Sequence, residues 1–264
     1  MTKVIILGSG AAPGVPAIAK GWGNCDPHNK KNIRTRTGTY IEIGTQKLLI
    51  DTSPDLRMQV LANQIKHIDA VLYTHAHADH SHGIDDLREF NRLTKKPLDI
   101  YGSAPTIEEL NHRFSYLMCN GNCADGGAFK ASLFPHIMNM QEDFYLGDVK
   151  IGLLELSGHM MPSNGYIFND GEIVYIADCS VICNSALAKI KTQPKLLVLP
   201  LTTISSPWQK CFHMGLDKVL EYVNLIKPQR VVINHMAVEC DYDHINDLTP
   251  QNVFPAYDNM VIEF

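Results

Sequence analysis

Three histidines and one aspartate lie within six residues, in the segment HAHADH from His75 to His80. The apolar run AVLY at residues 70–73 precedes them and predicts a strand. Imidazole is the commonest metal ligand, and with carboxylate it suits zinc, manganese or iron better than calcium. Alternate residues of an extended segment point the same way, so His75 and His77 can hold one ion. Asp79 and His80 fall where the chain turns and indicate the start of a second site. The alternative is a polar loop that is merely rich in histidine.

Composition limits what else the chain can be. With 264 residues, 45% of them hydrophobic, it is long enough for one large α/β domain or two small ones. A net charge of -5 argues against general binding to nucleic acid or to an anionic membrane. The longest apolar runs, such as residues 196–201, are too short to span a bilayer. Seven irregularly spaced cysteines and the lack of a signal-peptide pattern favour a cytoplasmic protein with reduced thiols.

Hydrophobic periodicity predicts strands and helices in a mixed order. We expect strands at residues 4–7, 39–43, 47–51, 69–74, 98–101, 129–137, 149–156, 166–168, 173–177, 196–201, 230–234 and 260–264. We expect helices through residues 56–61 after an N-cap at Ser53, from about 82 to 90, and at 105–117, 184–190 and 215–226. No linker or low-complexity segment is visible. This order predicts two mixed β-sheets packed face to face, with helices outside, in a single domain over residues 1–264.

Two early loops are rich in glycine or in charge. Gly8–Pro16 is a Gly/Pro loop whose glycines allow close approach of the backbone to a ligand, and a plain turn is the equal alternative. The segment Gly21–Arg36 contains the basic run Lys30–Arg36. That run is either a solvated face or an attractor of anions near a phosphate site. Arg88 and Arg113 have the same two interpretations.

Four predicted apolar runs end in a residue type that binds metals: His75, His159, Asp178 and His235. Ligands gather at the carboxyl ends of sheet strands, so these four ends are expected to share one rim. His159 or His235 alone would more often be structural. Together with the HAHADH segment they make seven candidate ligands: His75, His77, Asp79, His80, His159, Asp178 and His235. Seven ligands suit two divalent ions that share one carboxylate. Zinc is favoured, and manganese or iron are the alternatives.

The HAHADH segment resembles the HxHxDH signature of the metallo-β-lactamase fold superfamily, and His159, Asp178 and His235 match its remaining ligands in order and approximate spacing. The resemblance covers essentially the whole chain and implies an αββα four-layer sandwich of two mixed β-sheets. It implies that one ion is bound by His75, His77 and His159, and the other by Asp79, His80 and His235. Asp178 would bridge the two ions.

A narrower resemblance concerns the phosphoribosyl 1,2-cyclic phosphate phosphodiesterases of phosphonate breakdown. The matching features are residues 8–16 and 22–25, Asp51, Gly83, residues 165–166, and residues 212–213. The resemblance implies that His213 is a general acid. The resemblance would also imply a structural zinc in the early loop, bound by a cluster of cysteines and a histidine. This chain departs from that pattern, because its loop offers Cys25 and His28 and Val238 stands where the late histidine would be. Whether these residues or the pair Cys119 and Cys123 bind an extra metal stays open.

The expected function is a dinuclear metal-dependent phosphodiesterase that acts on a small cyclic or nucleotide-like phosphodiester. A metal-bridging hydroxide, oriented by Asp79, would attack phosphorus, and His213 would protonate the leaving alkoxide. The first alternative is a carboxyl-ester, lactone or thioester hydrolase on the same centre. The second is a nucleotide-binding protein with little turnover. We expect no membrane partner and no extended nucleic acid, and a homodimer is possible. The substrate-binding residues are not identified by any motif.

Overall fold

The computed structural model describes residues 1–119, 130–205 and 212–264. Its first sheet has seven strands, of which the antiparallel half comes from the N- and C-terminal segments and the parallel half follows β3. The strands in spatial order are β15 (Met260–Glu263), β1 (Lys3–Gly8), β2 (Gly38–Ile43), β3 (Gln46–Ile50), β4 (Ala70–Leu72), β5 (Leu98–Gly102) and β6 (Leu133–Ile137).

The second sheet has eight strands and is also mixed. Its main order is β11 (Val181–Ile182), β8 (Val149–Ser157), β9 (Asn164–Phe168), β10 (Ile173–Tyr175), β12 (Leu196–Pro200), β13 (Arg230–Asn234) and β14 (Val253–Pro255), and β7 (Phe144–Leu146) pairs with β8. β8, β9 and β10 pair antiparallel, and β10, β12, β13 and β14 run parallel. The carboxyl ends of β8, β10 and β13 therefore lie at the same end of this sheet.

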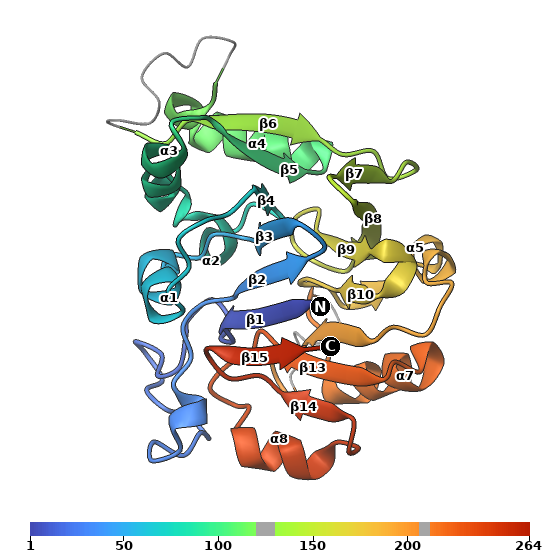
Figure 1. Ribbon diagram of the computed structural model, residues 1–264. Coiled ribbons are helices and arrows are strands. Elements are labelled where there is room, and N and C mark those ends of the chain that lie inside the picture. The colour runs from blue at the N-terminus through green and yellow to red at the C-terminus, as the bar shows by residue number, and fades with distance from the viewer. Residues whose placement is uncertain (120–129, 206–211) are drawn as a thin grey trace.

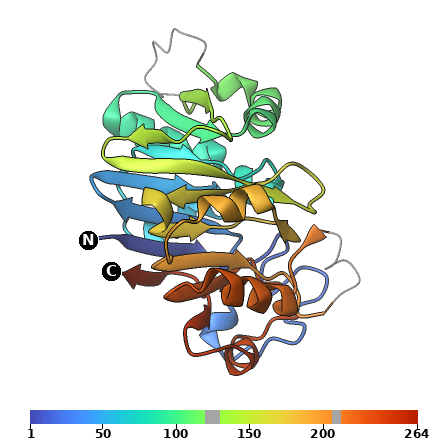
Figure 2. The same cartoon turned by 90° about the vertical axis from the view of Figure 1, so that its right-hand side faces the viewer.

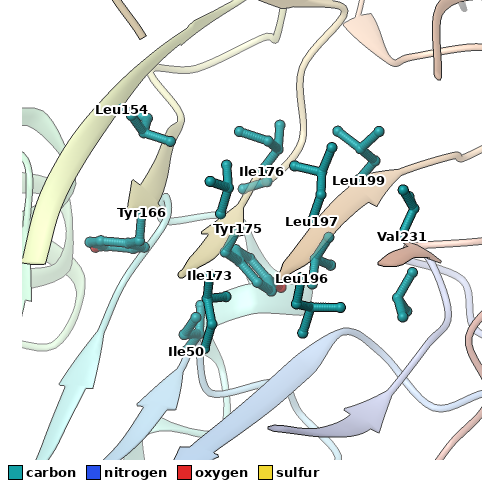
Figure 3. Close-up of a cluster of buried hydrophobic side chains, with 14 of the residues drawn as sticks. Ile50, Leu154, Tyr166, Ile173, Tyr175, Ile176, Leu196, Leu197, Leu199 and Val231 are labelled. Carbon is teal, nitrogen blue, oxygen red and sulfur yellow. The ribbon is translucent and has the colours of Figure 1, made fainter. Parts of the chain in front are cut away.

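The inner faces of the two sheets form one apolar core. Ile50 of the first sheet belongs to the same buried cluster as Ile173, Tyr175, Leu197 and Leu199 of the second, and Figure 3 shows these side chains between the strands. Each of the five is at most 2% exposed. Burial of this many branched and aromatic side chains is the main favourable contribution to folding, at about 25 cal/mol per Å² of apolar surface removed from water.

Helices cover the outer faces (Figures 1 and 2). Those next to the first sheet are α1 (Leu56–Ala62), α2 (Ala78–Ser81), α3 (Arg88–Thr94) and α4 (Ala104–Arg113), and a second buried cluster includes side chains from both layers. Those on the other side are α5 (Asn184–Lys189), α7 (Leu216–Ile226) and α8 (Tyr242–Leu248). Short 3-10 segments are η1 (Lys30–Asn32), η2 (Ile84–Leu87), η3 (Ser115–Leu117) and η4 (Asn169–Gly171). The predicted αββα four-layer sandwich is confirmed.

Most predicted elements are present, with two corrections at helix starts. The helix expected from about residue 82 is three pieces, because α2 already begins at Ala78 and η2 separates it from α3. The N-cap of α1 is Asp55 rather than Ser53, whose hydroxyl instead accepts a hydrogen bond from the Asp55 backbone N–H at 3.2 Å. The short elements β7, β11, α8 and β14 were not predicted. In the described part of the chain no helix is both long and apolar enough to span a bilayer.

Candidate metal centre

All seven predicted ligands lie close together, and each stands just after a strand or in the first turn of α2. His75 and His77 follow β4, and Asp79 and His80 belong to α2. The other three positions follow strands of the second sheet: His159 after β8, Asp178 after β10 and His235 after β13. Two sheets that pack face to face bring these strand ends to one rim. The convergence of the seven side chains therefore follows from the topology and from where the apolar runs end.

Three imidazoles point their nitrogens at one spot. His77 Nδ1 lies 3.1 Å from His75 Nε2 and 3.0 Å from His159 Nε2. The three ligand atoms lie within 4.8 Å of one another. Three facing imidazole nitrogens cannot all be satisfied by sharing protons, since a neutral ring offers one donor and one acceptor. A cation at their centre satisfies all three lone pairs, so this group fits a metal ion.

A second group of ligand atoms consists of two carboxylates and two imidazoles, all buried: Asp79, His80, Asp178 and His235. His235 Nε2 lies 3.0 Å from Asp178 Oδ2 and 3.3 Å from Asp79 Oδ2. His80 Nε2 is buried without a hydrogen-bond partner, 3.3 Å from Asp79 Oδ2. A buried imidazole nitrogen of this kind is costly unless something binds it. This mixed oxygen and nitrogen donor set fits a second divalent ion.

The outer nitrogens of four histidines are held by fixed partners. His159 Nδ1 donates to the Phe212 carbonyl at 3.1 Å, and His80 Nδ1 donates to Asp51 Oδ2 at 2.7 Å. The other two contacts are His75 Nδ1 with Thr74 Oγ1 at 3.0 Å and His235 Nδ1 with Thr202 Oγ1 at 3.1 Å. A carbonyl and a carboxylate only accept, so the protons of His159 and His80 sit on Nδ1. Nε2 of both rings is then available to a metal, and such outer contacts orient metal-binding histidines.

Asp51 is the outer residue with the most contacts, and it was not among the predicted site residues. It directly follows β3, is fully buried and adopts φ 61°, a left-handed conformation that is uncommon for a residue with a side chain. Besides His80, its carboxylate accepts the Thr74 backbone N–H at 2.8 Å and the Thr74 hydroxyl at 2.7 Å. Burial raises the pKa of Asp51, and His80 opposes that change. Like the predicted ligands, Asp51 stands at the end of an apolar run, and that signal could have identified it.

The buried charges of the candidate ligands shift one another's pKa values. Burial disfavours the charged forms, yet the His80 and His235 imidazoles bring the pKa of both Asp79 and Asp178 below the usual value. Burial opposes a charge on His80 too, but Asp79 and Asp51 raise its pKa well above the usual value. Burial lowers the pKa of His75 well below its usual value, and the charge of His80 adds to that change. His80 therefore carries a second proton, on Nε2, that must leave when a metal binds there.

His213, the predicted general acid, lies beside the centre. Its ring centroid is 5.2 Å from that of His159 and 5.9 Å from that of His235, and its Nδ1 is 3.9 Å from Asp178 Oδ2. Burial lowers the pKa of His213 to about 4, so the ring is neutral near pH 7. His213 and Asp79 both line a cavity of about 850 Å³. Its polar lining includes Lys20, Arg36, Thr202 and Glu239, and its apolar lining includes Ala12, Pro13, Ala17, Ile18, Ala19 and Val238.

The early loop does not form a further metal group among the described residues. The Cys25 thiol donates to the Val238 carbonyl at 3.4 Å, and the Arg34 guanidinium lies 3.9 Å from its sulfur. His28 is exposed, and neither it nor Cys25 belongs to a cluster of ligand atoms close enough to share an ion. The positively charged guanidinium of the buried Arg34 therefore lies beside Cys25, where a metal ion would have to bind. Cys119 is disulfide-bonded, and Cys123, the other cysteine of that candidate pair, lies outside the described residues.

Comparison with protein families defines the family of the chain. Residues 46–236 match the family model described as "Beta-lactamase superfamily domain", and this segment contains the whole predicted ligand set. The chain belongs to this family. It is a metallo-β-lactamase fold metallohydrolase, as the sequence resemblance implied.

The chain is similar to several individual proteins. The chain is similar to a crystal structure described as a new diphosphatase from the PhnP family, with 26% identity, a TM-score of 0.87, and coverage of 100% of this chain and 98% of that one. Zinc-bound PqqB from Methylobacterium extorquens shares the fold at 19% identity, with a TM-score of 0.75 over 99% of this chain and 100% of that one. A curated relative, an octanoyltransferase of Porphyromonas gingivalis, is 25% identical over 98% of this chain and 51% of its own length. This chain thus spans about half of that relative.

The raised pKa of His80 predicts a pH-dependent affinity for metal. An ion that binds His80 must displace its proton, so affinity should rise with pH by up to about tenfold per unit while His80 is protonated in the free protein. Calorimetric titration with zinc in buffers of different ionisation enthalpy measures the released protons. His67→Ala, which removes an exposed histidine that pairs with Asp69, is the control and should leave the proton count unchanged. A pH-independent affinity without proton release would contradict this account.

Proposed function

We propose that the protein is a dinuclear metal-dependent phosphodiesterase that hydrolyses a small cyclic or nucleotide-like phosphodiester. The observation that carries the proposal is a pair of adjacent ligand groups that open, through Asp79 and His213, onto one cavity. Two neighbouring divalent ions suit in-line displacement at phosphorus, because they stabilise both the attacking and the leaving oxygen.

The ligand assignment is part of the proposal. His75, His77 and His159 would hold one ion and Asp79, His80 and His235 the other, with Asp178 as a ligand available to both. The rich imidazole set favours zinc, and the second group also accepts manganese or iron. When bound, the two ions supply Lewis acidity and lower the pKa of water to about 7.

The side chains have separate tasks in the proposed reaction. Asp79 lines the cavity and accepts a hydrogen bond from the attacking water, which orients a lone pair of that water toward phosphorus. His213 donates a proton to the leaving oxygen. The free protein keeps His213 neutral near pH 7, since burial lowers its pKa to about 4. A phosphate that binds beside the ring brings negative charge and raises that pKa, so protonation of His213 accompanies substrate binding.

Similar proteins support hydrolysis of phosphate esters or anhydrides. The PhnP-family structure is described as a diphosphatase, and a ribonuclease Z of Bradyrhizobium is 27% identical over 38% of this chain. The cavity accommodates a small substrate, and we propose no extended nucleic acid as a partner. A cytoplasmic location, a single domain over residues 1–264 and a homodimer remain part of the proposal. The cysteines do not decide the compartment, because Cys25, Cys179 and Cys240 are buried and free whereas Cys119 is disulfide-bonded.

The apolar side of the cavity favours a second candidate, an acyl-ester or thioester hydrolase. Ala12, Ala17, Ile18 and Ala19 offer alkyl surface next to the centre, and one relative is called an octanoyltransferase. The alkyl chain of an octanoyl thioester would lie along this wall, and its carbonyl would lie toward Asp79 and His213. The two candidates differ in the reacting atom, so a substrate panel distinguishes them.

One prediction of the proposed function concerns the reaction class. Protein loaded with two equivalents of zinc or manganese should hydrolyse bis(p-nitrophenyl) phosphate and five-membered cyclic ribose phosphates, and chelation should abolish both activities. The same panel includes a 2′,3′-cyclic nucleotide, a lactone and octanoyl-coenzyme A. Phosphorus and thiol assays with metal analysis provide the readout. Turnover of the thioester without turnover of any diester would replace the first candidate by the second.

Another prediction concerns the role of His213 as the general acid. In His213→Ala, the rate with an unactivated sugar alkoxide leaving group should fall about 10²- to 10⁴-fold, the usual size of general acid catalysis. The rate with p-nitrophenolate should change little, because that group leaves without a proton. Equal losses with both leaving groups, or no loss with either, would remove His213 as the acid. His67→Ala is the matched control for loss of one imidazole.

A further inference from the structure

Arg113 has a partner that neither interpretation of its charge predicted from the sequence. It is the last residue of α4, and its Nη1 donates to the Ala76 carbonyl at 2.7 Å. Ala76 lies between the candidate ligands His75 and His77, and it is only 1% exposed. Among the described residues, Arg113 is not one of those that line the large cavity beside the centre. Its guanidinium therefore contacts the backbone of the ligand segment and does not face that cavity.

His77 differs from the other four histidines among the candidate ligands. Each of those four has its outer ring nitrogen in contact with a fixed partner, which is Asp51, Thr74, Thr202 or Phe212. His77 directs Nδ1 toward the other two imidazoles of its group, and its Nε2 has no hydrogen-bond partner in the described part of the chain. Outer contacts of the ring usually orient a metal-binding histidine. The orientation of His77 therefore depends on its backbone.

Hydrogen bonds hold the peptide groups on both sides of His77. The Ala76 carbonyl belongs to the peptide group before it and accepts the Arg113 guanidinium. The Ser81 hydroxyl donates to the His77 carbonyl at 2.8 Å and lies 3.3 Å from the Ala76 oxygen. Because peptide groups are planar, fixing both carbonyls fixes φ and ψ of His77, which are -63° and 155°. The direction in which its side chain leaves the backbone is then fixed as well.

The guanidinium of Arg113 is itself held in place. Ile107 and Leu110 of α4 are buried in the cluster between the helices and the first sheet, which fixes the helix. Arg113 Nε donates to Glu109 Oε1 at 2.7 Å, one turn earlier in the same helix. A hydrogen bond from a charged donor is stronger than one between neutral groups. Arg113 thus links a rigid helix to the buried Ala76 carbonyl, 37 positions earlier in the sequence.

We propose that Arg113 is a positioning residue that, through the Ala76 carbonyl, holds the His77 imidazole in the orientation needed to bind an ion. The same group contains His75 and His159. This inference rests on the proposed function, which assigns one ion to these three histidines. Arg113 is not a ligand and does not contact the substrate, so its effect is on the affinity for metal.

The test measures zinc affinity in variants of Arg113. In Arg113→Met, one of the two zinc equivalents should bind about 10- to 100-fold more weakly, the usual effect of losing an outer partner of a metal ligand, and the other should be unchanged. Competition with a chromophoric chelator resolves the two equivalents. The visible spectrum of the cobalt(II)-loaded protein should also change, because it reports the coordination geometry. Arg113→Lys keeps a cationic donor on a long side chain and should restore part of the affinity.

Two control variants separate the carbonyl contact from a change of charge. Arg88→Met removes an arginine that pairs with Glu89 on the surface. Glu109→Gln removes the negative charge beside Arg113 and leaves the contact with the Ala76 carbonyl. Both variants should keep the zinc affinity of the wild type. Unchanged affinity in Arg113→Met, an equal weakening of its two equivalents, or the same loss in Glu109→Gln would overturn the inference.

A measurement on the metal-free protein distinguishes failure of this inference from failure of the proposed function. The His80 backbone N–H donates to the His77 carbonyl at 3.1 Å, and its hydrogen exchange can be followed by NMR without metal or turnover. Exchange should be faster by about 10-fold or more in Arg113→Met, the size expected for one lost charge-assisted hydrogen bond, and unchanged in Arg88→Met.

The combined outcomes are unambiguous. If exchange and zinc affinity depend on Arg113 but no diester is hydrolysed, the positioning role stands and the phosphodiesterase proposal falls. If diesters are hydrolysed but neither exchange nor zinc affinity depends on Arg113, the reverse holds. A wild-type protein that binds no zinc, manganese or cobalt would overturn both.

Discussion

The contact between the Asp51 carboxylate and His80 connects the ends of β3 and β4 with α2, and the segment from β4 to α2 carries His75, His77, Asp79 and His80. Asp51 follows β3, Thr74 follows β4 and His80 lies in α2, and one buried carboxylate contacts all of them. The next residue reinforces this link, because the Thr52 backbone N–H donates to the His80 carbonyl at 2.7 Å. Removing one partner of a buried charged pair leaves the other uncompensated, which is typically worth 3–5 kcal/mol. The geometry of the ligands thus depends on a few buried polar contacts behind them.

Much of the fold could be predicted from the sequence because its strands are short, apolar and well separated. Runs such as residues 196–201 and 230–234 have few alternatives to a buried strand. The ligand positions were predictable for the same reason, since the sequence places His75, His159, Asp178 and His235 immediately after such runs. The topology then needed only to bring those strand ends to one rim. Spacing separated His75 and His77 from Asp79 and His80, and the superfamily resemblance supplied the grouping of His159, Asp178 and His235.

The missed features depend on tertiary contacts that no local pattern encodes. β7 and β11 are two or three residues long and exist only because β8 offers them an edge. The helix after residue 77 is divided into α2, η2 and α3, and the periodicity of the apolar residues does not predict these breaks. The orientation of Arg36 depends on Asp55, 19 positions away in the sequence. Burial beside His159 and His235 lowers the pKa of His213, and the sequence does not show that burial.

The proposed function requires that one rim of this sandwich bind two divalent ions with a shared Asp178. The most direct measurement is anomalous diffraction from crystals of the protein loaded with zinc, at the zinc absorption edge. We expect two peaks about 3.5–4 Å apart. One should lie within bonding distance of His75, His77 and His159, the other next to Asp79, His80 and His235, and Asp178 should touch both. A single peak, or peaks bound by other residues, would contradict the account.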